Sequence, residues 1–208
     1  MPMPAVRTIF LDFGNVIGFF DHNRAAAQLV PYTDLTAAEL ERAVWGADIF
    51  DDYECGAVTT ADFIRASKEA GRLTCSDAFF IEAFADIFTR NEEVCAVVPK
   101  LKPRYRLVLA SNTCVAHYDR YCREFADIIP YFDHLCPSFE AGSRKPAAAY
   151  FAYCQRFADA DPADCLFVDD LAGHIAAAGV HGWRAVQYKT DSGFVGNLRA
   201  AGVVVGDD

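Results

Sequence analysis

Short apolar runs alternate with helical patterns along most of this chain. Several of these runs are apolar at every position, as are strands of a parallel sheet that is covered on both faces. The predicted strands comprise residues 8–12, 105–111, 133–138, 165–170 and 184–188, and the predicted helices between them comprise residues 115–125, 147–157 and 172–180. Strands that alternate with helices of this length form βαβ units, so the expected fold class is α/β, with a doubly wound parallel sheet.

The segment 21–90 breaks this rhythm, because it carries helix signals and no convincing strand. Thr36 and Glu39, for example, have the spacing of a capping box at the start of a helix. We therefore expect an α/β core formed by residues 1–20 and 91–208, with residues 21–90 inserted as a small helical cap over the carboxyl edge of the sheet.

The composition is that of a soluble globular protein: of 208 residues, 53% are hydrophobic and 23% are charged. The net charge of −10 argues against binding to nucleic acid or to an anionic membrane, since both require a basic patch. No run is long and apolar enough to span a bilayer, and Asp12 interrupts the only N-terminal run that resembles a signal peptide. The eight cysteines lack zinc-type spacing and suit reduced core positions, so we expect a cytoplasmic protein. No pattern indicates the oligomeric state.

Polar residues stand at the carboxyl ends of three predicted strands. Asp12 ends the first strand, Ser111 ends the second, and Asp169 and Asp170 end a later one, while Lys145 lies in a loop before a helix. Ligands of open α/β sheets bind at this edge, so these residues are expected to converge on one crevice. Each has a local alternative as a cap or a solvated loop residue, but their joint position favours a functional site.

These residue types suit phosphoryl transfer. A carboxylate nucleophile forms an acyl phosphate, which divides one difficult displacement into two easier ones. Mg²⁺ requires only one or two carboxylates besides phosphate and water, and Asp12 and Asp170 would supply them. A lysine and a serine hydroxyl would stabilise the phosphoryl oxygens, and backbone N–H groups after Asp12 and Ser111 would hold the phosphate.

The order of these motifs resembles that of the haloacid dehalogenase-like (HAD) hydrolases, over nearly the whole chain. The motifs are D-F-G-N at residues 12–15, the strand ending at Ser111, G-S-R-K-P with Lys145, and V-D-D at residues 168–170. The first motif is most similar to that of the small D-x-G-N-V phosphatases, which include bacterial α-glucose-1-phosphate phosphatases. The resemblance implies a Rossmann-like core, an inserted cap, and Mg²⁺-dependent hydrolysis of a small phosphomonoester, a sugar phosphate being one candidate.

The resemblance also implies roles for individual residues. Asp12 would be the nucleophile, phosphorylated during turnover, and a Mg²⁺ ligand together with the carbonyl oxygen of Gly14. Asp170 would be the main acidic metal ligand, with Asp169 acting directly or through water. These residues would form the metal site.

The phosphate would be held by a second group of residues. Ser111 would contact a phosphoryl oxygen, Asn112 would add an amide, and Lys145 would bridge the nucleophile and the phosphate. Backbone groups of Gly14 and Asn15 would complete the cradle.

Two positions depart from the family pattern. Gly14 stands where most family phosphatases carry an aspartate as general acid, and His174 stands where relatives often carry Asn or Asp. The lost acid predicts a preference for good leaving groups, such as those of sugar 1-phosphates. Asp21 or His22 could instead reach back as a substitute acid, although both also suit exposed positions near the cap hinge. Specificity is expected from the cap, with residues 48–56 as one candidate face.

Three other classes of function use similar parts. A response-regulator receiver has the same residue types, but its acidic pair comes first in the chain and it lacks an inserted helical block. A 2-haloacid dehalogenase would use Asp12 to attack carbon and would not need the acidic pair. A catalytically weak protein that binds a phosphorylated ligand is the third alternative, because the general acid is absent at Gly14.

Overall fold

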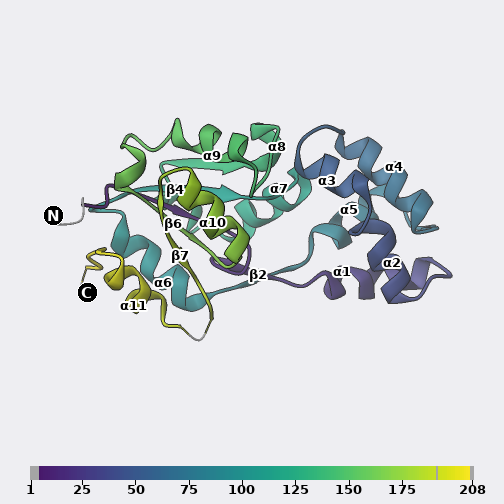
Figure 1. Ribbon diagram of the computed structural model, residues 1–208. Coiled ribbons are helices and arrows are strands. Elements are labelled where there is room, and N and C mark those ends of the chain that lie inside the picture. Colours follow the sequence, from purple (N-terminus) through teal and green to yellow (C-terminus); the bar gives the residue numbers. More distant parts are fainter. Residues whose placement is uncertain (1–4, 191, 207–208) are drawn as a thin grey trace.

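A parallel β-sheet forms the centre of the larger part of the molecule (Figure 1). The computed structural model describes residues 5–190 and 192–206. The strands of this sheet are β1 (Thr8–Leu11), β4 (Arg106–Ser111), β5 (His134–Pro137), β6 (Cys165–Asp169) and β7 (Arg184–Gln187). Their order is β5-β4-β1-β6-β7, and every neighbouring pair is parallel. The predicted doubly wound α/β fold is therefore confirmed, and each strand lies within its predicted run.

Helices cover both faces of this sheet. Alternate side chains of β1 point to opposite faces, so Ile9 and Leu11 belong to one apolar cluster and Phe10 belongs to another. The covering helices are α6 (Glu92–Leu101), α7 (Val115–Glu124) and α11 (Phe194–Ala200) on the first face, and α9 (Ala148–Gln155) and α10 (Ala172–Val180) on the second. Of these, α7, α9 and α10 were predicted, whereas α6 and α11 were not.

Five helices inserted between β1 and α6 form the smaller part of the molecule, on the right of Figure 1. They are α1 (His22–Leu29), α2 (Ala37–Val44), α3 (Asp48–Glu54), α4 (Thr60–Ala70) and α5 (Asp77–Ala85). Four of them begin at a side chain that accepts a hydrogen bond from the first turn, namely that of Asp21, Thr36, Thr59 or Ser76. The predicted capping box of Thr36 and Glu39 is among these and is confirmed.

Two short strands join the helical part to the sheet. β2 (Gly18–Phe20) leads into the helices, β3 (Phe88–Arg90) leads out, and the two pair antiparallel, with Gly18 opposite Arg90. The expectation that residues 21–90 contain no strand was therefore wrong. Three residues are too few to show an alternating pattern, and the partner of β3 lies far away in the sequence.

Apolar packing is continuous between the two parts. The cluster on the first face of the sheet extends to Phe63, Phe80 and Phe84 of the helical part. The division into a core (1–20 and 91–208) and a cap (21–90) stays a prediction. The remaining elements are α8 (Ser138–Ala141) and 3₁₀ turns at 30–32, 129–131 and 162–164. Among the described residues, no helix has the length and apolar character needed to cross a membrane.

Candidate active site

Asp12 lies directly beyond the carboxyl end of the central strand. Its backbone N–H donates to the carbonyl oxygen of Val168 at 2.9 Å, which extends the pairing of β1 with β6 by one residue. The chain then turns sharply, with Asn15 in a left-handed conformation (φ 54°) and its N–H donating to Gly18 at 2.8 Å. The turn directs the N–H of Phe13 onto Oδ1 of Asp12 at 2.7 Å. Asp12 is therefore held in place by its own loop, with only 7% of its surface exposed.

Lys145 joins Asp12 to Asp169. Its Nζ lies 2.8 Å from Oδ1 of Asp12 and 2.7 Å from Oδ2 of Asp169, and it also donates to the carbonyl oxygen of Ala110 at 2.9 Å. Burial acts to lower the pKa of this ammonium group, but the two carboxylates keep the pKa above its ordinary value. Lys145 is therefore a buried, fully hydrogen-bonded cation between two acids.

Asp169 is occupied on both oxygens. Oδ1 accepts from the N–H of Leu171 at 2.9 Å and lies 2.9 Å from Nδ1 of His174, while Oδ2 accepts from Lys145. Burial acts to raise the pKa of Asp169, but Lys145 and His174 hold the pKa below its ordinary value. The contacts make Asp169 a support for Lys145 and His174, and its predicted contact with a metal stays a prediction.

Asp12 has the opposite electrostatic balance. Burial, together with the charges of Asp169 and Asp170, outweighs the effect of Lys145 and raises the pKa of Asp12 from 3.8 to about 8. Burial also raises the pKa of Asp170, against a hydrogen bond of 3.0 Å that Nδ2 of Asn15 donates to its Oδ2. The site thus concentrates more negative charge than Lys145 neutralises.

This excess of charge suits a divalent cation. Oxygen atoms of Asp12 and Asp169 and a nitrogen of His174 lie within 4.8 Å of one another, and Asp170 follows Asp169 directly. Carboxylate oxygens are the ligands that hard cations prefer, and a cation would relieve the repulsion that raises the pKa of Asp12. Asp169 and His174 already bind each other, and the role of Asp12 and Asp170 as metal ligands stays a prediction.

The predicted phosphate residues of β4 lie beside the lysine. Ser111 is the last residue of β4 and is buried. The side chain of Asn112 forms two hydrogen bonds with the backbone of Lys145, accepting from its N–H at 2.8 Å and donating to its carbonyl oxygen at 3.0 Å. The amide of Asn112 therefore positions the lysine loop, which the sequence analysis did not predict.

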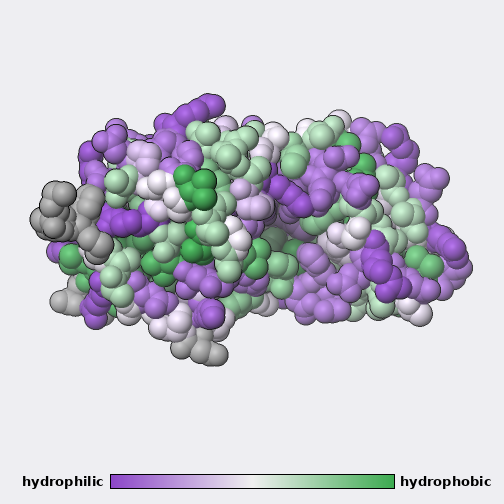
Figure 2. Space-filling model, viewed as in Figure 1, coloured by the Kyte–Doolittle hydropathy of each residue, from purple (hydrophilic) through white to green (hydrophobic). Residues whose placement is uncertain are grey.

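A cavity of about 160 Å³ opens beside this edge, between the sheet and the helical part. Figure 2 shows the surface hollowed between the two parts of the molecule. Four predicted site residues line the cavity, namely Gly14, His22, Ser111 and Asn112. Asn15 and Asp170 line a second cavity, next to Gln187 and Tyr188. The structure thus places six of the predicted residues on two cavities, whereas Asp12, Lys145 and Asp169 line neither of them.

The sequence analysis missed several residues of the first cavity. Phe50 and Glu54 reach it from α3, within the segment 48–56 that was expected to face the substrate. His117 and Tyr121 reach it from α7. Their spacing of four residues places them on one face of the helix, and this periodicity was the signal that could have identified them.

Asp21 has a structural role at the start of α1. Its Oδ1 accepts from the N–H of Asn23 at 2.9 Å, so the side chain caps the helix and is exposed. The ring of His22, in contrast, is half-buried and stacks on Trp45 with 5.1 Å between centroids. Of the two substitute acids considered, only His22 lies on the cavity.

A buried carboxylate and lysine thus lie together at the carboxyl edge of a Rossmann-like sheet, beside an inserted helical block. The family comparison gives the class of protein. The family model of the haloacid dehalogenase-like hydrolases matches residues 6–182, and the chain belongs to this family. The suspected superfamily is therefore confirmed.

Solved structures with the same fold include two that match this chain almost end to end. A predicted HAD-like family hydrolase from Porphyromonas gingivalis has a TM-score of 0.81 and 20% identity, covering 95% of this chain and 98% of that one. A HAD family enzyme from Bacteroides thetaiotaomicron, in complex with magnesium and inorganic phosphate, has a TM-score of 0.76 and 20% identity, covering 91% and 98%. A 2-haloacid dehalogenase from Pseudomonas syringae has a TM-score of 0.62 and 18% identity, covering 88% and 86%. At these identities the similarity establishes the fold.

Proposed function

We propose that this protein is a Mg²⁺-dependent phosphatase that hydrolyses a small phosphomonoester through an aspartyl-phosphate on Asp12. The observation that supports this most strongly is the environment of Asp12, which is buried at the sheet edge and contacts Lys145 at 2.8 Å. The acidic pair Asp169 and Asp170, at the end of β6, gives the same site its excess negative charge. The structural neighbour from Bacteroides thetaiotaomicron, which was solved with magnesium and phosphate, is consistent with this proposal.

In the first step, a carboxylate oxygen of Asp12 attacks the phosphorus atom, and the bond from phosphorus to the ester oxygen breaks. The electron pair of that bond leaves with the alcohol oxygen, which takes up a proton. In the second step, water attacks the phosphorus atom of the aspartyl-phosphate, which releases inorganic phosphate and restores the Asp12 carboxylate. Oδ1 of Asp12 already accepts two hydrogen bonds, so Oδ2 is the oxygen assigned to the attack.

The other residues stabilise charge during both steps. Lys145 would offset the negative charge on the phosphoryl oxygens, and the Ser111 hydroxyl would donate to one of them. Asp12, Asp170 and the carbonyl oxygen of Gly14 would hold the Mg²⁺. When bound, this ion would neutralise phosphoryl charge and favour the ionised form of the nucleophile.

The site supports protonation of the leaving group poorly. Gly14 has no side chain to donate a proton, and burial lowers the pKa of His22, so its imidazole is mainly neutral at neutral pH. A substrate with a good leaving group depends less on an acid. The site therefore favours esters of acidic alcohols over those of ordinary ones.

The cysteine thiols bear on the cellular compartment of the protein. All eight cysteines are free, and six of them are buried. Because persistent free thiols are typical of a reducing environment, we place the protein in the cytoplasm as part of this proposal.

Release of inorganic phosphate from a panel of phosphomonoesters tests the proposed function. We expect turnover that requires Mg²⁺, disappears in EDTA, and falls by several orders of magnitude in Asp12→Asn, because no second nucleophile is available. Asp34→Asn is the matched control, since this exposed carboxylate contacts only Arg72 among the ion pairs of the described residues. Full activity of Asp12→Asn or of the EDTA-treated protein would refute the proposal.

The same assay separates the two alternatives. A 2-haloacid dehalogenase would release halide from a 2-haloacid without a metal and would release no phosphate. A protein that only binds a phosphorylated ligand would show binding in Mg²⁺ with no turnover. Both outcomes differ from the one that we expect.

A further inference from the structure

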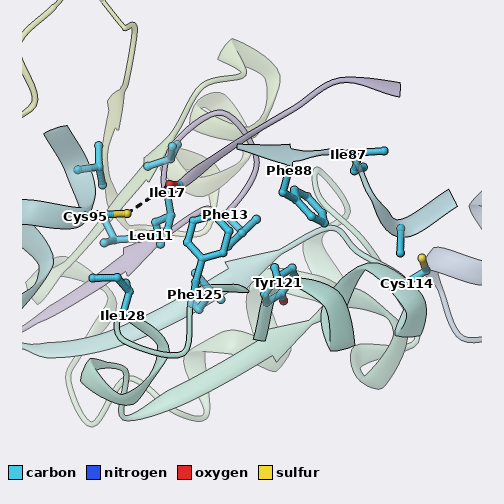
Figure 3. Packing of buried hydrophobic residues seen from close by; sticks show 14 of the residues in the cluster. Leu11, Phe13, Ile17, Ile87, Phe88, Cys95, Cys114, Tyr121, Phe125 and Ile128 are labelled. Carbon is cyan, nitrogen blue, oxygen red and sulfur yellow. Dashed lines mark hydrogen bonds between the residues drawn. The ribbon is translucent and has the colours of Figure 1, made fainter. Parts of the chain in front are cut away.

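The cavity beside Asp12 has walls made largely of aromatic rings. Phe20 and His22 come from the entry to the helical part, Phe50 comes from α3, and Phe88 comes from β3. Figure 3 shows the rings of Phe13, Phe88 and Tyr121 gathered in the same region, and Phe88 lies edge-on to Tyr121 at 6.0 Å between centroids. Ser111, which is assigned to the phosphate, lines the same cavity.

The polar groups on these walls are mostly occupied. Glu54 is paired with Arg144 at 2.7 Å, so its charge is already neutralised. Nε2 of His117 donates to the carbonyl oxygen of Phe84 at 3.2 Å, and burial lowers the pKa of this imidazole to about 3, so the ring is neutral. Glu54 and His117 therefore add no unpaired charge to the walls.

One buried polar atom on the cavity has only a poorly directed partner. Tyr121 is 1% exposed, and its hydroxyl lies near the Ser111 side chain but forms no well-aligned hydrogen bond with a described residue. Burial raises the pKa of this hydroxyl well above its ordinary value and outweighs the opposing interaction with Ser111, so the group is a neutral O–H donor. A buried donor that is poorly partnered is costly, so its position on the cavity points to a ligand oxygen that it would bind.

The size of the cavity limits the ligand. Its volume is about 160 Å³. An apolar protein cavity of about 150 Å³ takes up benzene, so a single six-membered ring fits. Ser111 and Asn112, which are assigned to the phosphate, line one part of this cavity, and the alcohol part of the ester would occupy the rest.

We propose that this cavity binds one aromatic ring, so that the substrate class is the phosphate monoester of an aromatic alcohol with a single ring. This proposal rests on the proposed phosphatase function and names its substrate class. The ring packs between Phe50 and Phe88, and the Tyr121 hydroxyl donates to the ester oxygen at the ring. Bond cleavage gives a phenolate, which takes its proton from water after leaving. A phenolate is a much weaker base than an alkoxide, so it can leave without a proton from an acid at position 14, where this chain has glycine.

A sugar 1-phosphate also has a good leaving group, but a sugar fits this cavity less well than an aromatic ring does. A hexose carries hydroxyl groups on every side, and each one buried without a partner weakens binding by a factor of about ten. Aromatic walls with occupied polar groups cannot satisfy them. The cavity therefore favours a flat apolar ring over a sugar.

Kinetics with paired substrates in Mg²⁺ test this proposal. Phenyl phosphate and glucose 1-phosphate both leave readily, and we expect KM to be at least about tenfold lower for phenyl phosphate. Benzyl phosphate and cyclohexylmethyl phosphate have similar leaving oxygens and differ in their rings, and we expect a lower KM for the flat aromatic ring. A KM for glucose 1-phosphate equal to or below that for phenyl phosphate would overturn the proposal and leave the phosphatase function intact.

Variants of the walls give a second test. Phe50→Leu keeps an apolar residue but loses the ring, and we expect it to raise KM for phenyl phosphate about threefold to tenfold more than KM for acetyl phosphate, which has no ring. Tyr121→Phe is expected to lower kcat for phenyl phosphate more than it raises KM. Phe79→Leu is the control, since Phe79 is exposed on α5 and outside the cavity. Equal effects of Phe50→Leu on both substrates would contradict the assigned position of the ring.

Binding without turnover separates the two proposals. Calorimetry on the Mg²⁺-loaded protein with phenylphosphonate and methylphosphonate measures the ring preference directly, and we expect phenylphosphonate to bind at least about tenfold more tightly. Tighter binding of phenylphosphonate with no turnover of any ester would support the ring site and refute the phosphatase. Equal binding of both phosphonates, together with turnover of an ester, would refute the ring site and support the phosphatase function.

Discussion

Two residues, Lys145 and Asp169, decide the charge state of Asp12. Lys145 lies between Asp12 and Asp169 at 2.8 and 2.7 Å, so one ammonium group serves two carboxylates. Asp169 has further partners in His174 and the N–H of Leu171, whereas Asp12 has only the N–H of Phe13 besides the lysine. The deficit of positive charge therefore falls on Asp12, whose pKa rises to about 8.

This deficit predicts a pH-dependent stability of the metal-free protein. The pKa of Asp12 is about 8 in the folded state, against 3.8 for an ordinary aspartate, so the folded state binds an extra proton between these values. Stability then falls as pH rises through this window. In urea unfolding with EDTA, we expect Asp12→Asn to gain stability relative to wild type between pH 5 and pH 8, by about 1 kcal/mol or more.

Added Mg²⁺ provides the control for this prediction. We expect it to stabilise wild type more at pH 8 than at pH 5, because binding requires the ionised carboxylate, and to stabilise Asp12→Asn much less. Parallel pH profiles of wild type and Asp12→Asn in EDTA would show that Asp12 keeps an ordinary pKa.

Restoring an acid at Gly14 tests the role assigned to the leaving group. A Cβ at this position would lie 3.2 Å from Cε1 of Phe20, a ring that is 41% exposed and free to move aside. With phosphate esters of rising leaving-group pKa, we expect the rate of wild type to fall steeply and that of Gly14→Asp to fall less. For alkyl phosphates the gain is expected to be about 100-fold, at the lower end of what acid catalysis contributes.

Gly14→Ala adds the same Cβ without a carboxyl group and is the matched control. If Gly14→Ala and Gly14→Asp gave the same profile, the gain would not come from proton donation. A flat profile in wild type would mean that another group already protonates the leaving oxygen. His22→Ala would then identify that group if it made the profile steeper.

Among the elements, the end of α3 makes a close contact between the helical part and the sheet. Ser138, at the start of α8, donates to the carbonyl oxygen of Glu54 at 2.6 Å, and Arg144 binds the side chain of the same residue. Gly56 follows with φ +68°, and a Cβ there would lie 2.3 Å from the carbonyl oxygen of Phe139. This contact holds Phe50 and Glu54 against the cavity.

A pair of glycine variants measures this contact. Gly142 has a similar backbone (φ +63°), but a Cβ added there would meet no heavy atom within 4 Å, so Gly142→Ala should cost only the left-handed strain, about 1 kcal/mol. Gly56→Ala must also push α3 away from α8, so we expect a further loss of about 1–3 kcal/mol in urea unfolding and a higher KM. Equal costs for the two variants would show that α3 and α8 separate freely.

At the scale of the whole molecule, several polar contacts join the helical part to the rest of the chain, besides the apolar packing, and three of them bear on closure. These are the β2–β3 ribbon, the α3–α8 contact, and the pair of Arg120 with Asp86 at 2.9 Å. The predicted cap of residues 21–90 ends within this ribbon, in which Gly18 lies opposite Arg90. Because the two connections are hydrogen-bonded to each other, any closure must bend them together.

We predict that the helical part closes over bound substrate, since an aspartyl-phosphate requires controlled access of water. Small-angle scattering is expected to show a smaller radius of gyration when Mg²⁺ and a phosphonate bind together than with either alone. Gly18→Ala should reduce this change, because its Cβ would lie 2.9 Å from the Phe13 ring inside the bend. Identical scattering with and without ligands would rule out closure as a specificity device.

The sequence by itself determined the sheet, its order of motifs and the family. Buried parallel strands consist of apolar runs, and a polar residue placed directly after such a run must lie at the strand end, so Asp12, Ser111 and Asp169 could be placed without coordinates. The helix cap at Thr36 could also be predicted from the sequence, because a capping box depends on residues only three positions apart.

Only the tertiary structure decided how these residues share their partners. That Lys145 serves two carboxylates, that Asn112 holds the lysine backbone, and that β3 pairs with β2 depend on contacts between residues at least 24 positions apart, on which local patterns carry no information. The aromatic walls of the cavity also depend on contacts between residues that are far apart in the sequence. Phe50, Phe88 and Tyr121 each follow an ordinary apolar pattern, and only the packing of the helical part against the sheet brings them together around one space beside Asp12.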